Sequence, residues 1–266
     1  MLKLKHLIFL FSIVLLASCS RYNRVLNKGS VSDKYKMATE MYDAKKFDKA
    51  LRLFEMITPA YKGKPQMERI QFMVSISYFN TKDYANAAYY FERFVTNYPK
   101  SSKKEEATFF SAKCHYLASP KYSVDQTETK DALLAFQKYI NAYPNSKRLP
   151  EANQMVKELQ YKLETKAFMI AKQYFDIGYY TSAVVAFDNM TSTYLGTEYR
   201  EEAFFYKFKS AYELSVRSTF TKKYKRLVAA EKAYEKLERN YPESKYLKES
   251  QDLLKRVQKE IALILS

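Results

Sequence analysis

The amino-acid sequence predicts an all-α protein, a superhelical solenoid of about five helix–turn–helix repeats. The main observation is a recurring spacing: an alanine, an aromatic residue four positions later, and a tyrosine seven positions after that. The five copies are Ala50, Phe54 and Tyr61; Ala87, Phe91 and Tyr98; Ala132, Phe136 and Tyr143; Ala183, Phe187 and Tyr194; and Ala230, Tyr234 and Tyr241. The chain also has only 4 glycines and 7 prolines in 266 residues, which argues against a loop-rich protein.

The stretch Tyr84–Pro99 shows what each copy means physically. Ala87 and Phe91 are four residues apart, so they share one helix face, where the small residue admits a neighbouring helix and the ring fills the space beside it. Pro99 ends the helix because it lacks an N–H donor and clashes with the preceding turn. Each copy is therefore the second helix of a repeat. First helices are expected at residues 33–44, 66–80, 103–118, 164–176 and 200–215.

The second repeat resembles the tetratricopeptide (TPR) unit, which is about 34 residues long. Its matching positions are Ser75, Tyr78, Tyr84, Ala87, Phe91 and Pro99. The alanines of successive copies lie 37 to 51 residues apart, so the longer repeats need insertions, one of them expected at residues 119–130. We expect TPR repeats 1–3 over residues 31–149, and repeats 4 and 5 with linking and capping helices over residues 150–266. A long helix at residues 150–176 would link the two groups, and a basic loop is expected at Thr221–Arg226.

The N-terminus has the features of a bacterial lipoprotein signal over residues 1–18. Lys3 and Lys5 precede the apolar run Leu7–Leu16, which is too short for an ordinary membrane span. The small residues after it end in Cys19, which in such lipoproteins becomes the acylated first residue of the mature chain. Residues 19–30 are then expected to be a lipid-anchored polar tether. The alternative is an ordinary signal peptide or short anchor with an incidental cysteine.

The chain is strongly basic, with a formal net charge of +16, or +14 without Lys3 and Lys5. A basic balance of this size is one mark of nucleic-acid binding. The exported, lipid-anchored context argues against that partner and favours anionic lipid headgroups or acidic proteins. A third interpretation is that the lysines simply cover solvent-exposed helix faces.

No catalytic, metal or cofactor motif is present, so we expect a protein that is not an enzyme and needs no cofactor. The histidines are His6, within the signal, and His115, which follows Cys114 directly. Adjacent helical residues point to different sides, so this pair is a poor nucleophile–base dyad. Cys114 is expected to be a buried, inert thiol.

Binding is the remaining class of activity, and in a TPR stack the first helices line the concave surface. The repeat register then places five side chains in a peptide-binding groove near the N-terminus: Tyr35, Tyr42, Phe72, Ile76 and Phe79. Aromatic residues there would suit an extended, partly apolar peptide. The alternative for each residue is a place in the core between repeats.

The lipoprotein cysteine, short tether and five TPR units with an insertion in the third together resemble the BamD family. These are the lipoproteins of the outer-membrane β-barrel assembly (BAM) machinery. The stretches Cys19–Leu26 and Tyr42–Ala50, and Tyr143–Ser146 at the end of the third repeat, look especially like Bacteroidota-type members.

The resemblance implies a non-enzymatic scaffold facing the periplasm from the outer membrane, held there by the Cys19 acyl anchor. It implies that the N-terminal repeats bind unfolded outer-membrane protein clients and that the C-terminal repeats dock on the POTRA domains of a BamA-type β-barrel protein. Repeats one and four depart from the regular pattern, so no docking residue is carried over. The alternative function is another envelope TPR lipoprotein that coordinates cell-wall synthesis or division.

Overall fold

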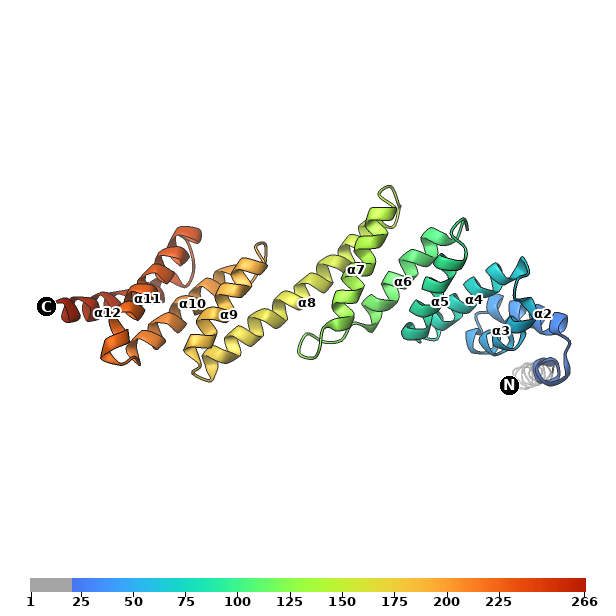
Figure 1. The fold of residues 1–266 in the computed structure, drawn as a ribbon, viewed down its shortest axis with the longest axis horizontal. Coiled ribbons are helices and arrows are strands. Elements are labelled where there is room, and N and C mark those ends of the chain that lie inside the picture. Colours follow the sequence, from blue (N-terminus) through green and yellow to red (C-terminus); the bar gives the residue numbers. More distant parts are fainter. Residues whose placement is uncertain (1–20) are drawn as a thin grey trace, which may run out of the picture. The chain divides into compact units, whose positions relative to one another are not determined.

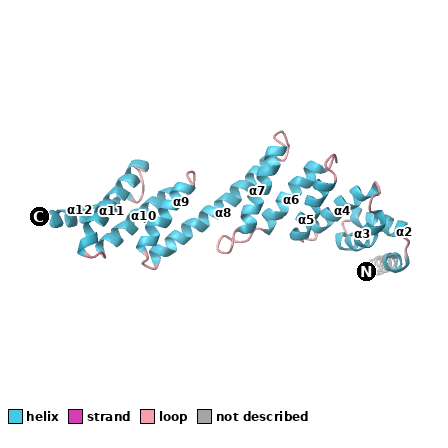
Figure 2. Ribbon diagram, in the orientation of Figure 1, coloured by secondary structure: helices cyan, strands magenta, loops and turns pink. Residues whose placement is uncertain are grey.

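A computed structural model describes residues 21–266, and this part of the chain is helical, with short connecting loops (Figure 2). The helices pair in chain order, which confirms the predicted all-α, TPR-like fold class (Figure 1). Their bounds are α2 Val31–Asp43, α3 Phe47–Tyr61, α4 Gln66–Asn80, α5 Tyr84–Asn97, α6 Lys104–Ala118, α7 Thr127–Ala142, α8 Leu149–Asp176, α9 Tyr180–Thr193, α10 Arg200–Val216, α11 Phe220–Asn240 and α12 Leu247–Leu265.

The chain divides into two compact units. The described part of the first comprises residues 21–119 and 127–156, and the second comprises residues 120–126 and 157–266. The division falls inside the long helix α8. The loop 120–126 belongs to the second unit, where Lys166 Nζ donates a hydrogen bond to the Val124 carbonyl at 2.5 Å.

In the first unit, α2 pairs with α3, α4 with α5 and α6 with α7. The alanine and aromatic residue of each recurring triplet are fully buried, as the shared helix face predicts: Ala50, Phe54, Ala87, Phe91, Ala132 and Phe136. Burial of such a ring stabilises the fold by about 1.5–3 kcal/mol, so this face is the main source of cohesion between the helices.

The second unit follows the same plan. Ala183 and Phe187 of α9 are fully buried in a cluster with Phe168 and Ala171 of α8. The last helix, α12, brings Val257 into the cluster of α10 and α11 and so covers the apolar face that a final repeat would otherwise expose.

The turn inside a repeat is built in the same way in three places. Lys45, Lys82 and Gly178 each follow the first helix with a positive φ, of 57°, 64° and 80°. The residue after each donates its N–H across the helix end, as Asp83 does to the Tyr78 carbonyl at 3.0 Å. This left-handed position ends the first helix and sends the chain back as the second.

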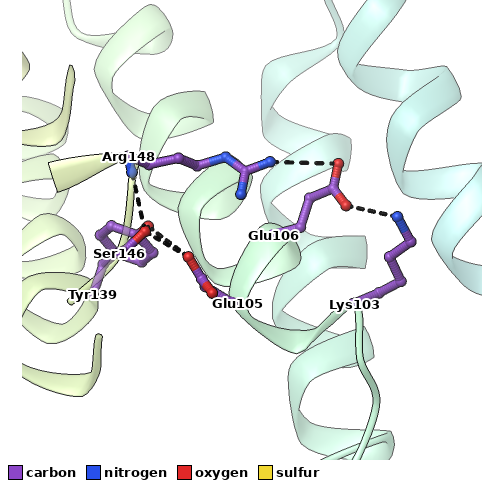
Figure 3. Close-up of polar contacts among 6 residues, drawn as sticks. All are labelled: Lys103, Glu105, Glu106, Tyr139, Ser146 and Arg148. Carbon is purple, nitrogen blue, oxygen red and sulfur yellow. Dashed lines mark hydrogen bonds and ion pairs between the residues drawn. The ribbon is translucent and has the colours of Figure 1, made fainter. Parts of the chain in front are cut away.

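A polar junction also recurs where one repeat passes into the next (Figure 3). The Ser146 hydroxyl, after α7, donates to Glu105 Oε1 at 2.5 Å in the first turn of α6, and it accepts the Arg148 N–H at 3.1 Å. Ser101 donates to Glu68 at 2.6 Å, and Ser244 donates to Glu201 at 2.7 Å. Each serine thus links the end of its repeat to the start of the same repeat. It also accepts a backbone N–H from the segment that leads into the next helix and so positions that segment.

Three local expectations differ from the structure. Residues 21–28, expected within a polar tether, are helical, and Tyr22 is buried, with its hydroxyl donating to the Lys49 carbonyl at 3.1 Å. The insertion expected at 119–130 is shorter, because α7 already begins at Thr127. The basic run Thr221–Arg226 is not a loop but belongs to the first turns of α11. Within residues 21–266, no helix is both long enough and apolar enough to cross a membrane.

Candidate functional site

The five side chains predicted to line a peptide groove form what we call the aromatic row: Tyr35, Tyr42, Phe72, Ile76 and Phe79. All five are half-buried. Their register repeats, because Tyr35 and Phe72 occupy equivalent positions on α2 and α4, as do Tyr42 and Phe79. Tyr42 contacts Phe47 with ring centroids 5.6 Å apart, and Phe79 makes the equivalent contact with Tyr84 at 5.9 Å.

Each ring of the aromatic row has aromatic neighbours in the fold. Phe72 lies 5.3 Å from Phe94 and 6.3 Å from Phe91, centroid to centroid, and Lys103 Nζ lies 5.3 Å from its ring. Phe79 lies 4.9 Å from Phe110 of α6. Tyr35 lies 5.4 Å from Tyr61, and Ile76 packs in the cluster of α5 and α6. The contacts agree with the alternative of a core between repeats, and the binding role of the row stays a prediction.

The Phe72 position in particular is a constant part of the repeat. Its equivalents Phe109, Phe168 and Phe205 each lie four residues after a glutamate, which is in the first turn of α6 and α10 and in the middle of the long helix α8. The residue that lies over each ring comes two positions after the junction serine, or after Thr197, which takes the same place before α10 and accepts the Tyr199 N–H at 3.3 Å. Arg148 lies 5.6 Å over Phe109, Tyr199 stacks on Phe168 at 4.7 Å, and Tyr246 stacks on Phe205 at 4.3 Å. A ring at this position therefore has a packing role in four repeats.

A groove lies on a different face of α4, between α3 and α5, and we call it the α4 groove. Its volume is about 740 Å³, and Met67, Gln71 and Val74 of α4 line it. The other lining residues are Glu55, Thr58, Pro59, Lys62, Gly63, Tyr90, Arg93, Asn97 and Tyr98. The aromatic row takes no part in this groove, because Phe72, Ile76 and Phe79 lie about a third of a turn or more around the helix.

The walls of the α4 groove are held by contacts across the repeat. Tyr78 donates to Glu55 Oε1 at 2.5 Å and stacks on Tyr90 at 5.0 Å. Burial, followed by the bond to Glu55, raises the pKa of Tyr78 well above its usual range, so the hydroxyl stays a donor. Asn97 donates to Gln71 Oε1 at 3.2 Å, and both residues line the groove. These contacts hold the groove in shape without filling it.

Two of the residues that line the α4 groove are cationic, Lys62 and Arg93, and one, Glu55, is anionic. The Arg93 guanidinium lies 5.4 Å from the Tyr89 ring and donates to its hydroxyl at 3.2 Å, while Lys62 stands at the end of α3. Aromatic and aliphatic walls with a few polar groups suit an extended peptide segment. The repeat register did not reveal this surface, because it was used to assign only the concave side of the first helices. The adjacent tyrosines Tyr89 and Tyr90 were the feature of the sequence that could have pointed to this surface. In the structure Tyr89 is exposed and Tyr90 is half-buried.

His115 lies in a second groove, of about 510 Å³, with α5 and α7 at its sides. Its Nε2 is 3.4 Å from Glu92 Oε1, and its Nδ1 is 3.4 Å from Glu128 Oε2. Cys114 is fully buried, and burial together with Glu92 raises its pKa to about 12, so no thiolate forms near neutral pH. Within residues 21–266, no cluster of three or more His, Cys, Asp or Glu side chains is placed to hold a metal ion.

Comparison with known proteins decides the family. Residues 27–227 match the family YfiO, described as "Outer membrane lipoprotein". The chain belongs to this family.

Relatives named as BamD agree with this assignment. A putative outer membrane protein assembly factor BamD of Aquifex aeolicus is 27% identical over 237 residues, which cover 86% of this chain and 75% of the relative. BamD of Rickettsia prowazekii is 23% identical over 82% of this chain and 83% of its own length. BamD of Neisseria meningitidis MC58 is 22% identical over 83% and 82% of the two chains.

Membership of the YfiO family identifies the protein as an outer-membrane lipoprotein and confirms two predictions, the outer-membrane location and the absence of enzymatic activity. The narrower resemblance to Bacteroidota-type members gains no support, because the relatives come from other bacteria. Cys19, the predicted lipidation site, lies outside the described residues.

Proposed function

We propose that the chain is a non-enzymatic scaffold lipoprotein of the BAM machinery. It binds unfolded outer-membrane protein segments and a BamA-type β-barrel subunit. The observation that carries this proposal is the family match over residues 27–227, which includes repeats from both units, together with relatives named as outer membrane protein assembly factors. A scaffold needs extended binding surfaces and no reactive group, and repeat stacks supply such surfaces.

We place the client segment on the first unit, where two surfaces compete. The first is the aromatic row, which would offer ring faces to an apolar segment. The second is the α4 groove, favoured by its volume of about 740 Å³ and by Lys62 and Arg93 in its lining. A client segment that ends in an aromatic residue and a carboxylate would complement both the tyrosines and Arg93.

Paired variants separate the two surfaces in a titration of a fluorescent peptide that has the C-terminal sequence of an outer-membrane protein and ends in an aromatic residue. Phe72→Leu with Phe79→Leu alters the row and keeps apolar volume, whereas Arg93→Gln with Tyr90→Leu alters the groove. A groove site predicts roughly tenfold weaker binding for the groove pair alone, since one lost charge-assisted contact is worth about 1.5–3 kcal/mol. A client site on the aromatic row predicts weaker binding for the row pair and unchanged binding for the groove pair. Unchanged affinity in both pairs, with helical circular dichroism intact, would exclude both surfaces as the client site.

The second unit is proposed to dock the POTRA domains of the BamA-type subunit. The alternative is an envelope lipoprotein that coordinates cell-wall synthesis or division, and it differs in partners rather than in fold. Purification of the tagged lipoprotein from a detergent extract should recover a BamA-like barrel protein. Recovery of cell-wall enzymes without such a barrel would overturn the BAM assignment in favour of the alternative.

The membrane anchor is proposed to be the acylated Cys19. Cys19→Ala should release the protein from sedimented membranes, whereas Cys114→Ala, which alters the other cysteine, should leave it membrane-bound. Several acyl chains hold a protein stably on a bilayer because each buried CH₂ contributes about 0.8 kcal/mol. A Cys19→Ala variant that still sediments would show that another feature anchors the chain.

A further inference from the structure

A basic pocket lies at the start of the described chain, between residues 21–29 and helix α2. We call it the N-terminal basic pocket. It has a volume of about 460 Å³ and is lined by Arg21, Arg24, Val25, Lys28, Gly29, Asp33, Lys36 and Met37. Four of its eight lining side chains are cationic, so it differs in chemistry from the α4 groove.

The fold positions the backbone that carries the cations of the pocket, and their side chains are exposed to solvent. Arg21, Arg24 and Lys28 are spaced three and four residues apart in the helical segment 21–28, so they share one face, and Lys36 comes from α2. Tyr22 fixes the segment against the first repeat, since its buried ring packs in the core of α2 and α3 and its hydroxyl donates to the Lys49 carbonyl.

Gly29 sets the turn between the helical segment and α2. Its N–H donates to the Val25 carbonyl at 2.9 Å, and a Cβ added there would lie 2.5 Å from that carbonyl oxygen. Only glycine fits this close approach, which brings Lys36 of α2 to the same hollow as Arg24 and Lys28.

Most of the positive charge in the pocket is not neutralised within the protein. Arg21 pairs with Glu40 at 3.2 Å. Asp33 already accepts hydrogen bonds from the Ser30 N–H and hydroxyl, at 3.1 and 2.7 Å, in the capping box of α2. Among residues 21–266, Arg24, Lys28 and Lys36 form no ion pair. Asp33 is the one carboxylate that lines the pocket, and its charge attracts Lys36. Four cationic residues against one carboxylate still leave an excess of positive charge around this hollow, which favours an anionic ligand.

We propose that the N-terminal basic pocket binds the phosphate headgroup of an anionic phospholipid. The chemistry is that of a phosphodiester held by Arg24, Lys28 and Lys36, with the Val25 and Met37 side chains beside it. The proposal rests on the proposed anchor, because Arg24 lies five residues after Cys19, and acylation there would bring the pocket to the membrane surface. Basic segments next to a membrane anchor are attracted to anionic headgroups.

Amide hydrogen exchange on the full mature lipoprotein tests the pocket. The protein is reconstituted in vesicles of phosphatidylcholine alone or of phosphatidylcholine with phosphatidylglycerol. Exchange over residues 21–37 should slow roughly fivefold or more in the anionic vesicles, the factor expected from about one cation's attraction to an anionic surface. Raised salt should reduce this difference.

Neutralising variants identify the residues responsible. Arg24→Gln, Lys28→Gln and Lys36→Gln combined should abolish the difference between the two lipid compositions. The matched control is Lys222→Gln, Lys225→Gln and Lys236→Gln, which removes three exposed charges from α11 and should leave the difference intact. Equal exchange of the triple variant and the wild type in phosphatidylcholine vesicles shows that the segment still folds.

Failure of the anchor and failure of the pocket give different results. Without acylation the protein does not float with vesicles of phosphatidylcholine alone, where only the acyl anchor holds it. If the anchor holds but exchange over residues 21–37 is the same in both lipid compositions, the pocket proposal is overturned. A second comparison adds poly-glutamate to the protein in phosphatidylcholine vesicles. If poly-glutamate slows exchange over residues 21–37 more than the change to phosphatidylglycerol-containing vesicles does, the proposal is also overturned, because the pocket would then bind an acidic protein segment.

Discussion

Ser146 donates a hydrogen bond from its Oγ to Glu105 Oε1 at 2.5 Å, across 41 residues of sequence (Figure 3). Ser146 follows α7, the second helix of the third repeat. Glu105 lies in the first turn of α6, the first helix of the same repeat. The Tyr139 hydroxyl belongs to the same hydrogen-bonded cluster, and its oxygen lies 2.6 Å from Ser146 Oγ. Nearby, Glu106 pairs with Lys103 at 2.9 Å and with Arg148 at 3.8 Å. The junction therefore joins both helices of one repeat to the start of α8.

Removal of this junction should lower stability. Ser146→Ala loses the bond to the carboxylate and the acceptor for the Arg148 N–H, so we expect the free energy of unfolding to fall by about 1–2 kcal/mol. Urea unfolding followed by circular dichroism measures the change. Ser102→Ala, which alters an exposed serine beside the equivalent Ser101, should change stability by less than about 0.5 kcal/mol. Equal losses in the two variants would show that the junction contributes nothing specific.

The left-handed turn positions predict opposite effects of glycine at two equivalent sites. Lys82→Gly should stabilise the protein by up to about 1 kcal/mol, because a side chain at φ 64° is strained and glycine is not. Gly178→Ala, at φ 80°, should destabilise it by about the same amount. Gly196→Ala is the control, since that glycine has no positive φ and no atom within 4 Å of an added Cβ. Thermal unfolding of the three variants checks the signs.

Cys114 should be chemically silent in the folded protein. With a pKa raised to about 12, only about one molecule in ten thousand carries the thiolate at pH 8, and the side chain is also fully buried. Ellman's reagent should therefore react slowly with the native lipoprotein and rapidly after unfolding in urea. A fast native reaction mapped to Cys114 would contradict the burial, whereas one mapped to Cys19 would show that this cysteine is not acylated.

Alkaline pH should destabilise the fold. Burial raises the pKa of Tyr78 and Tyr139 above the ordinary tyrosine value of about 10. A pKa that is higher in the folded state stabilises the protein below the unfolded value, and this contribution is lost as pH rises toward the folded value. Several of the 25 tyrosines are exposed, so only the last part of the rise in tyrosinate absorbance, which comes from the buried rings, should coincide with the loss of helical circular dichroism above about pH 10. A complete tyrosinate spectrum with full helicity would contradict this coupling.

The aromatic row and the N-terminal basic pocket show how far the sequence predicts a site. The spacing of Phe72 and Phe79 placed them on one helix face, and that inference is local and sound. Their neighbours are Phe94 and Phe110, 22 and 31 residues away, and a periodic pattern does not say which of two apolar faces another helix will cover. Residues 21–28 are polar enough to suggest a tether, yet Tyr22 anchors them in the core of the first repeat and bonds to Lys49, 27 residues away.

The sequence by itself determined the repeats, the helices, the buried triplets such as Ala87 and Phe91, and the absence of a catalytic motif. All of these follow from residue spacing within one helix or from residue type, and both are local. Only the tertiary structure decided where open surface remains: the α4 groove beside Arg93, and the basic pocket formed by Arg24 and Lys36. Each of these surfaces is a space that the side chains of neighbouring helices leave unfilled. The size of that space depends on how the helices pack, and their packing depends on contacts between residues far apart in the chain.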